Sequence, residues 1–342
     1  MTLRQSALFV STLLALGAPA FAGELDPPAA PNGTPGPEPR IAINAENTPG
    51  DAEAHFVIGR RGSYYLPRSF ANLSFNSTKH GIVIEADDVT VDLQGFTLDG
   101  MDTIVFPFGV QGPQPSVTGI LASGHPDNVT VRNGVIRDWT GSGVDLEFAE
   151  NCTVENIDVF NCDVLGICAG ENATVNRCKA VNCGTTGIDV SNGGTISDCV
   201  ASDNGEDGIS GFNVLIRDCV SKDNTRDGYD LNRGILRDSI AEQNGRHGIR
   251  ARFICLVRDN VSHNQETGAG VFVEGTANRI EGNQIVSNET GILATGQSNV
   301  IIQNTVRNSA TSFNIVLNNT VGPTITVEDP VTSVNPWANF EL

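Results

Sequence analysis

The chain has 342 residues, with 40 Asp and Glu against 21 Lys and Arg, and a formal net charge of −19 at pH 7. A surface this acidic argues against nucleic acid and anionic membranes as partners. The chain has 37 glycines but only 6% aromatic residues, which favours a turn-rich stacked structure over a layered globule with a bulky core.

Residues 1–22 have the three parts of a secretory signal peptide. Arg4 is the one charged residue, residues 7–16 are apolar, and Ala20-Phe21-Ala22 supplies small residues for cleavage. The apolar stretch is shorter than the roughly 20 residues of a membrane-spanning helix. We therefore expect cleavage near Ala22 and a protein that is secreted, periplasmic or held at the cell surface, with no membrane span.

The rest of the chain reads as one domain behind a linker. Residues 23–40 carry six prolines and predict an extended linker. Residues 41–79 carry five Phe and Tyr and predict an N-terminal cap, because the open end of a solenoid has to be covered. Residues 80–312 predict repeated coils with an insertion at 101–117, and residues 313–342 predict a C-terminal cap.

A glycine followed by an apolar residue recurs along the coil region. These glycines are Gly81, Gly119, Gly143, Gly166, Gly187, Gly208, Gly228, Gly248, Gly268 and Gly291. After a first interval of 38 residues the spacing stays between 20 and 24 residues, which is typical of a solenoid. Short runs of Val, Ile, Thr and Ala between Gly, Asn and Asp predict strands and turns.

The residues one and three places after each glycine are small or aliphatic, with Tyr229 as the one aromatic member. Because side chains alternate between the two faces of a strand, Ile188 and Val190 should point into the core while Asp189 points to solvent. Asn residues recur three to five places before the glycines, where they tolerate left-handed turns and their stacked amides can hydrogen-bond along the axis. These are Asn161, Asn182, Asn204, Asn224, Asn244, Asn264 and Asn288.

Several segments resemble known coils. Gly62–Leu66, His80–Ile84 and Asp88–Leu98 are similar to the first coils, and Asn128–Val131 with Asn133–Ile136 to a standard coil, of the pectin-lyase-like superfamily. The resemblance implies an all-β fold, a single-stranded right-handed parallel β-helix solenoid of about ten coils with N- and C-terminal caps. That superfamily holds lyases, hydrolases, epimerases and non-enzymes, so it does not fix an activity.

The eight cysteines follow the same repeat. Cys178, Cys199 and Cys219 each stand nine residues before a coil glycine, and Ser239 continues their column, so we expect buried thiols there. Cys162 and Cys183 stand one coil apart at a turn, where either two thiols or a disulfide would fit an exported protein. The cysteine and histidine spacings match no zinc motif.

The outward positions next to the glycines become ionisable in the coils between residues 187 and 252. Asp189, Asp207, Asp227, Asp230, His247 and Arg250 should share one face. Residues 217–258 contain nine Arg or Lys against six Asp or Glu. This local basic excess could hold a polyanionic sugar chain, although such charges also solvate ordinary surfaces.

The first functional hypothesis is cleavage of a polyuronate by β-elimination, or its epimerisation at C5. It assigns His247 as base, with Asp227 and Asp230 in the catalytic group, and Arg250 or Arg252 as the clamp on the uronate carboxylate. Further substrate contacts would come from Arg246, Arg252, Asp189 and Asp207. Asp189, Asp207 and Asp230 offer the oxygen ligands that Ca²⁺ prefers.

The resemblances for this chemistry are partial. Asp227-Gly228-Tyr229-Asp230 is similar to the catalytic segment of alginate epimerases, but no Asp-Pro-His follows it. Asn224 to Asp227 resembles the Asn-Thr-Asp motif of polygalacturonases, with Arg226 interposed, and Arg246-His247-Gly248 resembles their His-Gly motif. A glycoside hydrolase is therefore a second hypothesis, and its paired-Asp motif is missing.

A third hypothesis is a non-catalytic extracellular rod that binds glycans or acts as a scaffold. Regular coils and the lack of a complete catalytic motif favour it. Only Met1 and Met101 are present and the five histidines are scattered, which gives no support to a role in copper delivery. We expect a monomer that takes polysaccharide as its partner.

Overall fold

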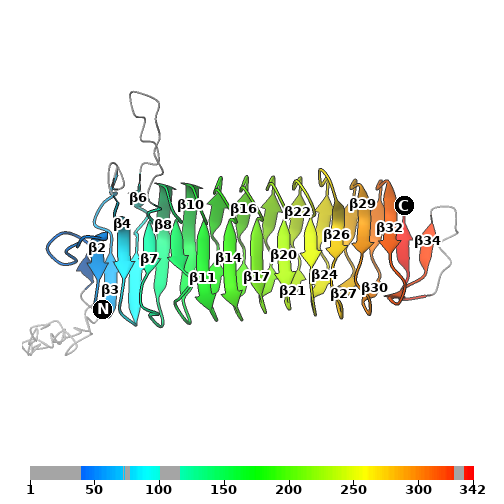
Figure 1. Ribbon diagram of the computed structural model, residues 1–342, viewed down its shortest axis with the longest axis horizontal. Helices are drawn as coiled ribbons and strands as arrows, with labels where there is room; N and C mark the ends of the chain where they lie inside the picture. Colours follow the sequence, from blue (N-terminus) through cyan, green and yellow to red (C-terminus); the bar gives the residue numbers. More distant parts are fainter. Residues whose placement is uncertain (1–39, 72, 74–77, 101–115, 327–334) are drawn as a thin grey trace, which may run out of the picture. The chain divides into compact units, whose positions relative to one another are not determined.

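The computed structural model describes residues 40–71, 73, 78–100, 116–326 and 335–342. The predicted signal peptide, the linker apart from Arg40, and residues 101–115 of the predicted insertion lie outside the described residues. Residues 40–342 form one compact unit, and their described part contains parallel strands and no helix. The strands wind into an elongated solenoid (Figure 1), which confirms the predicted all-β parallel β-helix.

One face of the solenoid is a twelve-stranded parallel sheet that takes one strand from each coil. Its strands, in order along the axis, are β2 (Ala54–Ile58), β4 (His80–Ile84), β7 (Ile120–Ala122), β9 (Val144–Leu146), β11 (Ile167–Glu171), β14 (Ile188–Asn192), β17 (Ile209–Phe212), β20 (Tyr229–Asn232), β23 (Ile249–Ala251), β26 (Ala269–Val273), β29 (Thr290–Ala294) and β32 (Thr311–Ile315). Ten of them, β4 to β29, lie in the predicted coil region. The predicted caps contribute β2 and most of β32, so the described chain makes about twelve turns against the ten predicted.

The other strands form a second sheet that covers the remaining two faces. On the first of these faces lie β1 (Ile41–Ala42), β3 (Gly62–Tyr65), β5 (Val89–Asp92), β12 (Thr174–Asn176), β15 (Thr195–Ser197), β18 (Leu215–Arg217), β21 (Ile235–Arg237), β24 (Leu256–Arg258), β27 (Arg279–Glu281), β30 (Val300–Ile302) and β33 (Thr320–Val321). The second face holds β6 (Thr97–Asp99), β13 (Lys179–Val181), β16 (Val200–Ser202), β19 (Val220–Lys222), β22 (Ile240–Glu242), β25 (Val261–His263), β28 (Gln284–Val286), β31 (Thr305–Arg307), β34 (Thr324–Thr326) and β35 (Asn339–Glu341). Two ten-residue strands, β8 (Thr130–Trp139) and β10 (Thr153–Cys162), run across both faces.

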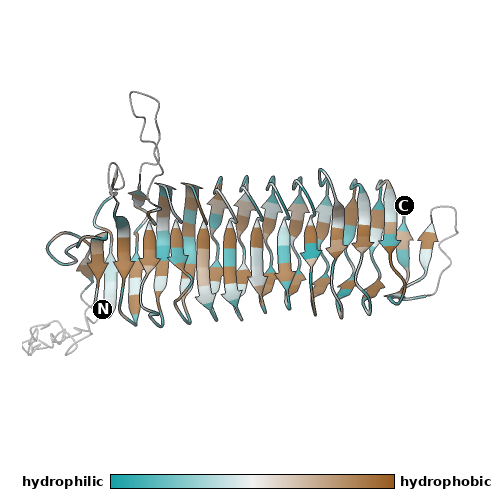
Figure 2. Ribbon diagram, in the orientation of Figure 1, coloured by the Kyte–Doolittle hydropathy of each residue, from teal (hydrophilic) through white to brown (hydrophobic). Residues whose placement is uncertain are grey.

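The core is filled by the alternation that the sequence predicts. Ile188 and Val190 are fully buried and pair in register with Ile209 and Gly211 of the next coil. Tyr229 is also fully buried, and its hydroxyl donates a hydrogen bond to the carbonyl oxygen of Ile240 at 2.9 Å. Figure 2 shows the resulting change between hydrophobic and hydrophilic residues along the strands.

The predicted register is wrong by two residues in one coil. Ile249 pairs with Val271, so the counterpart of Gly248 is Gly270 and not Gly268. A Cβ atom on Gly248 would lie 2.8 Å from the carbonyl oxygen of Gly270, so this position favours glycine. One extra residue lies in the turn between β23 and β24 and a second in the turn after β25, and the period alone cannot locate them.

The sequence analysis assigned both left-handed turns and stacked amide hydrogen bonds to one column of Asn residues. In the structure these Asn residues belong to two different columns. Asn161 and Asn182 adopt positive φ angles of 52° and 55°, and their amides form an exposed ladder. Asn204, Asn224 and Asn244 stand one place later in the coil and form a buried ladder, with amide-to-carbonyl distances of 2.9 Å. The next rung of the buried ladder is Gln265, not the predicted Asn264.

Apart from Cys168, which lies in the outward column of the twelve-stranded sheet, the cysteines occupy inward positions at the corners of the coils, as the buried amides do. Cys178, Cys199 and Cys219 stack as predicted, and the backbone N–H of Cys219 donates to Ser239 Oγ at 3.2 Å. Cys183 precedes Asn204 in the other corner column, where its backbone N–H donates to the Asn204 side chain. All eight cysteines are buried as thiols, so Cys162 and Cys183 form no disulfide.

Candidate functional site

A single outward column crosses the middle of the twelve-stranded sheet. Each member is the in-register neighbour of the next, so consecutive side chains lie one strand spacing apart, about 4.8 Å. The column contains Val83, Leu121, Asp145, Cys168, Asp189, Ser210, Asp230, Arg250, Phe272 and Leu293. It changes from apolar to acidic, then to basic and back to apolar, which places the ionisable groups in the middle coils.

A groove of about 240 Å³ lies on this face across four coils. Its polar lining comes from Asp189, Ser191, Asp207, Ser210, Asp230, Asn232 and Arg252, and Phe212 supplies an aromatic side chain. The structure thus brings four of the eight predicted site residues, Asp189, Asp207, Asp230 and Arg252, to one groove. Ser210, Phe212 and Asn232 belong to the same lining, and the sequence analysis missed them as site residues because the search followed ionisable residues only.

Two Arg–Asp pairs hold the basic end of the site. Arg252 makes a two-point contact with Asp230, with Nε 2.7 Å from Oδ1. Arg246 makes the same kind of contact with Asp227, again with Nε at 2.7 Å. Arg250 lies between the pairs, 3.8 Å from both aspartates, and donates to Glu274 at 2.7 Å. Bidentate geometry fixes both guanidinium planes.

Asp227 is inaccessible on this face. Its side chain is 0% exposed, and besides Arg246 it accepts the backbone N–H of His247 at 3.1 Å. These contacts assign Asp227 to holding Arg246 and the turn at His247. Asn224 of the same polygalacturonase-like motif lies in the buried ladder, so neither residue faces a substrate.

Two carboxyl groups of the groove have pKa values above the ordinary value of a surface aspartate. Burial raises the pKa of Asp189, an effect that the neighbouring Asp230 charge increases and the hydrogen bond from the Ser210 hydroxyl opposes. Burial also raises the pKa of Asp207, which accepts the backbone N–H of Asp227 at 3.0 Å. A raised pKa makes a carboxylate a stronger base near neutral pH.

His247 is oriented by its backbone contact. Its Nδ1 accepts the backbone N–H of Ala269 at 3.0 Å, and its ring stacks on Phe272 with 4.5 Å between centroids. A neutral ring that accepts at Nδ1 carries its proton on Nε2. The structure therefore presents His247 as a hydrogen-bond donor, whereas the sequence analysis expected a base. His80 repeats this arrangement, with Nδ1 3.0 Å from the N–H of Thr118.

These histidines predict a stability that falls on acidification. Burial lowers the pKa of both His80 and His247 below the ordinary value of 6.5. The unfolded chain therefore takes up protons first as the pH falls through 6.5, and the free energy of unfolding decreases over that range. Urea denaturation at about pH 7.5 and about pH 5.5 should show a larger loss for the wild type than for a His80→Gln/His247→Gln variant. Equal losses in the two proteins would contradict the assignment.

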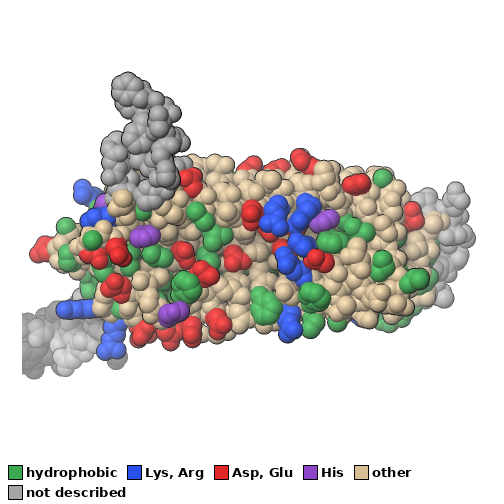
Figure 3. All heavy atoms as spheres, in the orientation of Figure 1, with side chains coloured by type: hydrophobic (Ala, Val, Ile, Leu, Met, Phe, Trp, Pro, Cys, Tyr) green, Lys and Arg blue, Asp and Glu red, His purple; other side chains and the backbone are tan. Residues whose placement is uncertain are grey.

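The predicted basic strip is dispersed and paired. Arg226, Arg246, Arg250 and Arg252 lie on this face, and each meets a carboxylate within the salt-bridge distance. Arg217, Arg237 and Arg258 end strands β18, β21 and β24 of the other sheet. Figure 3 shows Lys and Arg side chains gathered beside a His on this face, with acidic side chains around them. The face is an ion-pair network and not an open cationic surface.

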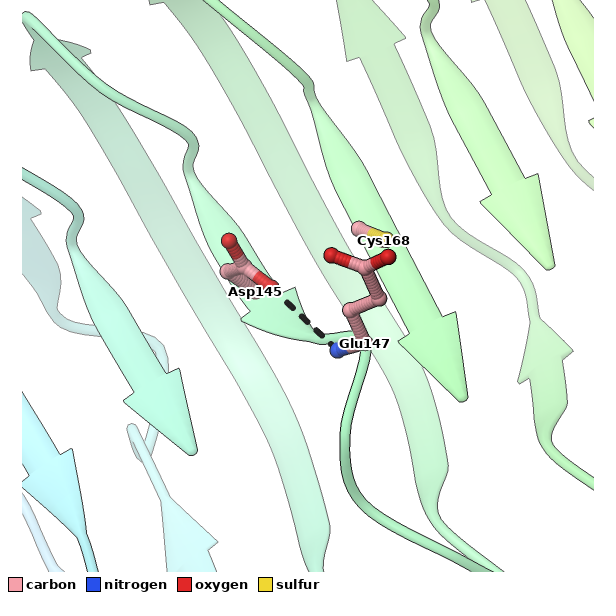
Figure 4. Close-up of side chains that lie close together, drawn as sticks. All are labelled: Asp145, Glu147 and Cys168. Atoms are coloured by element: carbon pink, nitrogen blue, oxygen red, sulfur yellow. Dashed lines mark hydrogen bonds between the residues drawn. The ribbon is translucent and has the colours of Figure 1, made fainter. Parts of the chain in front are cut away.

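The predicted Ca²⁺ ligands do not assemble. Within the described part of the chain, Asp189, Asp207 and Asp230 are not a group whose oxygens approach one another closely enough to share an ion. The oxygens of Asp230 are engaged by Arg252, and Asp189 accepts the Ser210 hydroxyl. A different group does gather, Asp145, Glu147 and Cys168, with ligand atoms within 4.8 Å of one another (Figure 4). The sequence analysis missed it because it looked for site residues only in the coils between residues 187 and 252.

The chain matches the family model described as the right handed beta helix region, over residues 68–220 and 118–252. Together these matches span more than half of the 342 residues, so the chain belongs to the right-handed β-helix family. None of the curated proteins matches the sequence.

Solved structures share the fold at low identity. The A-modules of the Azotobacter vinelandii mannuronan C-5 epimerases AlgE6 and AlgE4 are both 17% identical, with TM-scores of 0.61 and 0.59. They cover 79% and 77% of this chain, and 92% and 91% of their own chains. The Agl-KA catalytic domain is 12% identical with a TM-score of 0.54, over 82% of this chain and 62% of that chain. In the described part of this chain, no helix has the length and apolar character needed to cross a membrane.

Proposed function

We propose that this protein binds a polysaccharide chain lengthwise on the twelve-stranded sheet, in the groove between Asp189 and Arg252. The observation that carries the proposal is the in-register file of Asp189, Ser210, Asp230 and Arg250, one polar side chain per coil. The strand spacing of about 4.8 Å is comparable with the length of one sugar ring, so each successive coil can offer a polar contact to a successive ring.

The lining suits sugar hydroxyl groups. Asp189, Asp207 and Asp230 accept hydrogen bonds, while Asn232 and Arg252 can donate them. Phe212 borders the groove with its ring 5.9 Å from the Arg233 guanidinium carbon, and offers an apolar surface to a sugar ring. Export through residues 1–22, which we propose on sequence grounds, would bring this groove to extracellular glycans.

A second candidate function is the epimerisation or β-elimination of a polyuronate in the same groove. Arg252 and Arg250 favour it, because a uronate carboxylate can compete with Asp230 for the guanidinium groups. The shared fold with the mannuronan C-5 epimerase modules also supports it. Asp189, whose pKa is raised by burial, is the base in this candidate, and Arg252 the group that neutralises the carboxylate.

Glycan binding should depend on Arg252. We expect Arg252→Ala to weaken binding at least about 10-fold, because it removes a donor and leaves the Asp230 carboxylate to repel an acidic chain. Arg237→Ala, which changes an arginine on the other sheet, is the matched control. A panel of neutral glycans and polyuronates, measured by titration calorimetry, tests the proposal. If Arg252→Ala and Arg237→Ala bind equally well, or if the wild type binds no glycan, the glycan-binding proposal is rejected and the scaffold hypothesis remains.

Turnover separates the two candidates. We expect Asp189→Asn to keep polyuronate binding but to lower turnover by at least about 100-fold if Asp189 is the base. NMR of the products distinguishes an unsaturated end from a changed uronate ratio. Binding without any turnover by the wild type would reject the enzymatic candidate and retain the binding proposal.

A further inference from the structure

Cys168 occupies an unusual place in the fold. It lies in the outward column, between Asp145 on one side and Asp189 on the other. Nevertheless its side chain is only 2% exposed. Within the described residues its thiol has no hydrogen-bond partner, while Cys178, Cys199 and Cys219 donate to backbone carbonyls. Cys168 is therefore buried outside the core, whereas Cys178, Cys199 and Cys219 are buried within it.

Two carboxylates stand at this thiol. Asp145 belongs to β9 and pairs in register with Cys168 of β11, and Glu147 follows directly after β9. The backbone N–H of Glu147 donates to Asp145 Oδ1 at 3.2 Å, which fixes the turn that carries both acids. Figure 4 shows the Glu147 carboxylate close to Cys168, with the Asp145 carboxylate beside it.

We propose that Asp145, Glu147 and Cys168 form a site for a divalent transition-metal ion of the zinc class. One sulfur and two carboxylate oxygens within 4.8 Å of one another are a donor set that Zn²⁺ accepts. Tetrahedral binding at about 2.0–2.3 Å would bring the donors slightly closer together. Glu147 is exposed, so its side chain is free to make this adjustment. Binding replaces the thiol proton, which is released to solvent as the sulfur becomes a thiolate ligand.

The donor set argues against the hard cations. Ca²⁺ and Mg²⁺ require six or more oxygen ligands and do not favour sulfur. Three protein ligands leave one position of a tetrahedral zinc ion for water. The site lies one strand before Asp189 along the outward column, next to the proposed glycan groove but separate from its lining. The inference therefore does not depend on the proposed function.

Cobalt substitution tests the sulfur ligand directly. The purified full chain, free of an affinity tag and reduced with a phosphine, should bind one Zn²⁺ by titration and elemental analysis. Bound Co²⁺ should give a thiolate-to-metal charge-transfer absorption in the near ultraviolet. Cys168→Ser should abolish this absorption and weaken Zn²⁺ binding by at least about 100-fold. Glu147→Gln, a conservative change at an exposed residue, should weaken Zn²⁺ binding by about 10-fold or more.

The matched control is Cys219→Ser. Ser239 already occupies the next place in that column, so the control keeps the fold while it removes a different buried thiol. It should retain the charge-transfer absorption and the Zn²⁺ affinity. Lack of one-to-one Zn²⁺ binding, an absorption that survives in Cys168→Ser, or its loss in Cys219→Ser would each overturn the assignment. Unchanged affinity in Glu147→Gln, or preferential binding of Ca²⁺, would do the same.

Discussion

Asp227→Ala should be among the most destabilising substitutions in the chain, with a loss of about 3–5 kcal/mol in the free energy of unfolding. The Asp227 side chain is fully buried and receives two donors from Arg246 and the backbone N–H of His247. Alanine would leave Arg246 without its partner and the His247 N–H unsatisfied. Urea denaturation followed by circular dichroism measures the change.

A more exposed aspartate supplies the control for this prediction. Asp158 also pairs across coils, with Lys179 Nζ at 3.3 Å, but its side chain is 34% exposed. Asp158→Ala should cost less than about 1 kcal/mol, as is typical of surface pairs. Similar losses in the two variants would show that the burial of Asp227 does not have the energetic effect inferred from its contacts.

Asn224→Ala should cost about 3–5 kcal/mol, because it breaks a ladder in which each amide satisfies its neighbours. The Asn224 Oδ1 accepts both the backbone N–H and the side-chain amide of Asn204. Its own amide donates to Asn244 and to the carbonyl oxygen of Ala201. Alanine leaves these donors and acceptors buried without partners, and chemical denaturation again gives the free energy.

An Asn in a solvated ladder separates this effect from a general loss of amides. Asn192 accepts the side-chain amide of Asn213 at 2.9 Å on the exposed surface, where water replaces the lost contact. Asn192→Ala should therefore change the free energy of unfolding by less than about 1 kcal/mol. If Asn192→Ala costs as much as Asn224→Ala, burial is not what makes the inner ladder stabilising.

The solenoid could be predicted from local pattern because the repeat itself sets the structure. Successive coils supply small or apolar side chains at the same two positions, as Ile188 and Val190 do, and a tight approach at a glycine such as Gly228. Twelve coils make that pattern visible many times, so it does not rest on one local preference. The errors fell where the period changes, at Gly270 and Gln265, because a turn can take up extra residues without disturbing the strands on either side.

The repeat pattern predicted the candidate site only in part. Alternation placed Asp189 and Asp230 on one outward face, and the structure lines the groove with them. It could not show that Asp227 is buried beneath Arg246, because both lie in turns whose path follows no alternation. Nor could it show that Nδ1 of His247 is occupied by the Ala269 N–H, which makes that ring a donor.

The sequence by itself determined the fold, the repeat, the inward columns and the coils that carry ionisable side chains. These follow from periodicity, which is a property of neighbouring residues along the chain. Only the tertiary structure decided which charges pair, which carboxyl groups have a raised pKa, and that Cys168 meets Asp145 and Glu147. Those outcomes depend on distances between side chains in successive coils, about twenty residues apart in sequence, and on burial that no single coil creates.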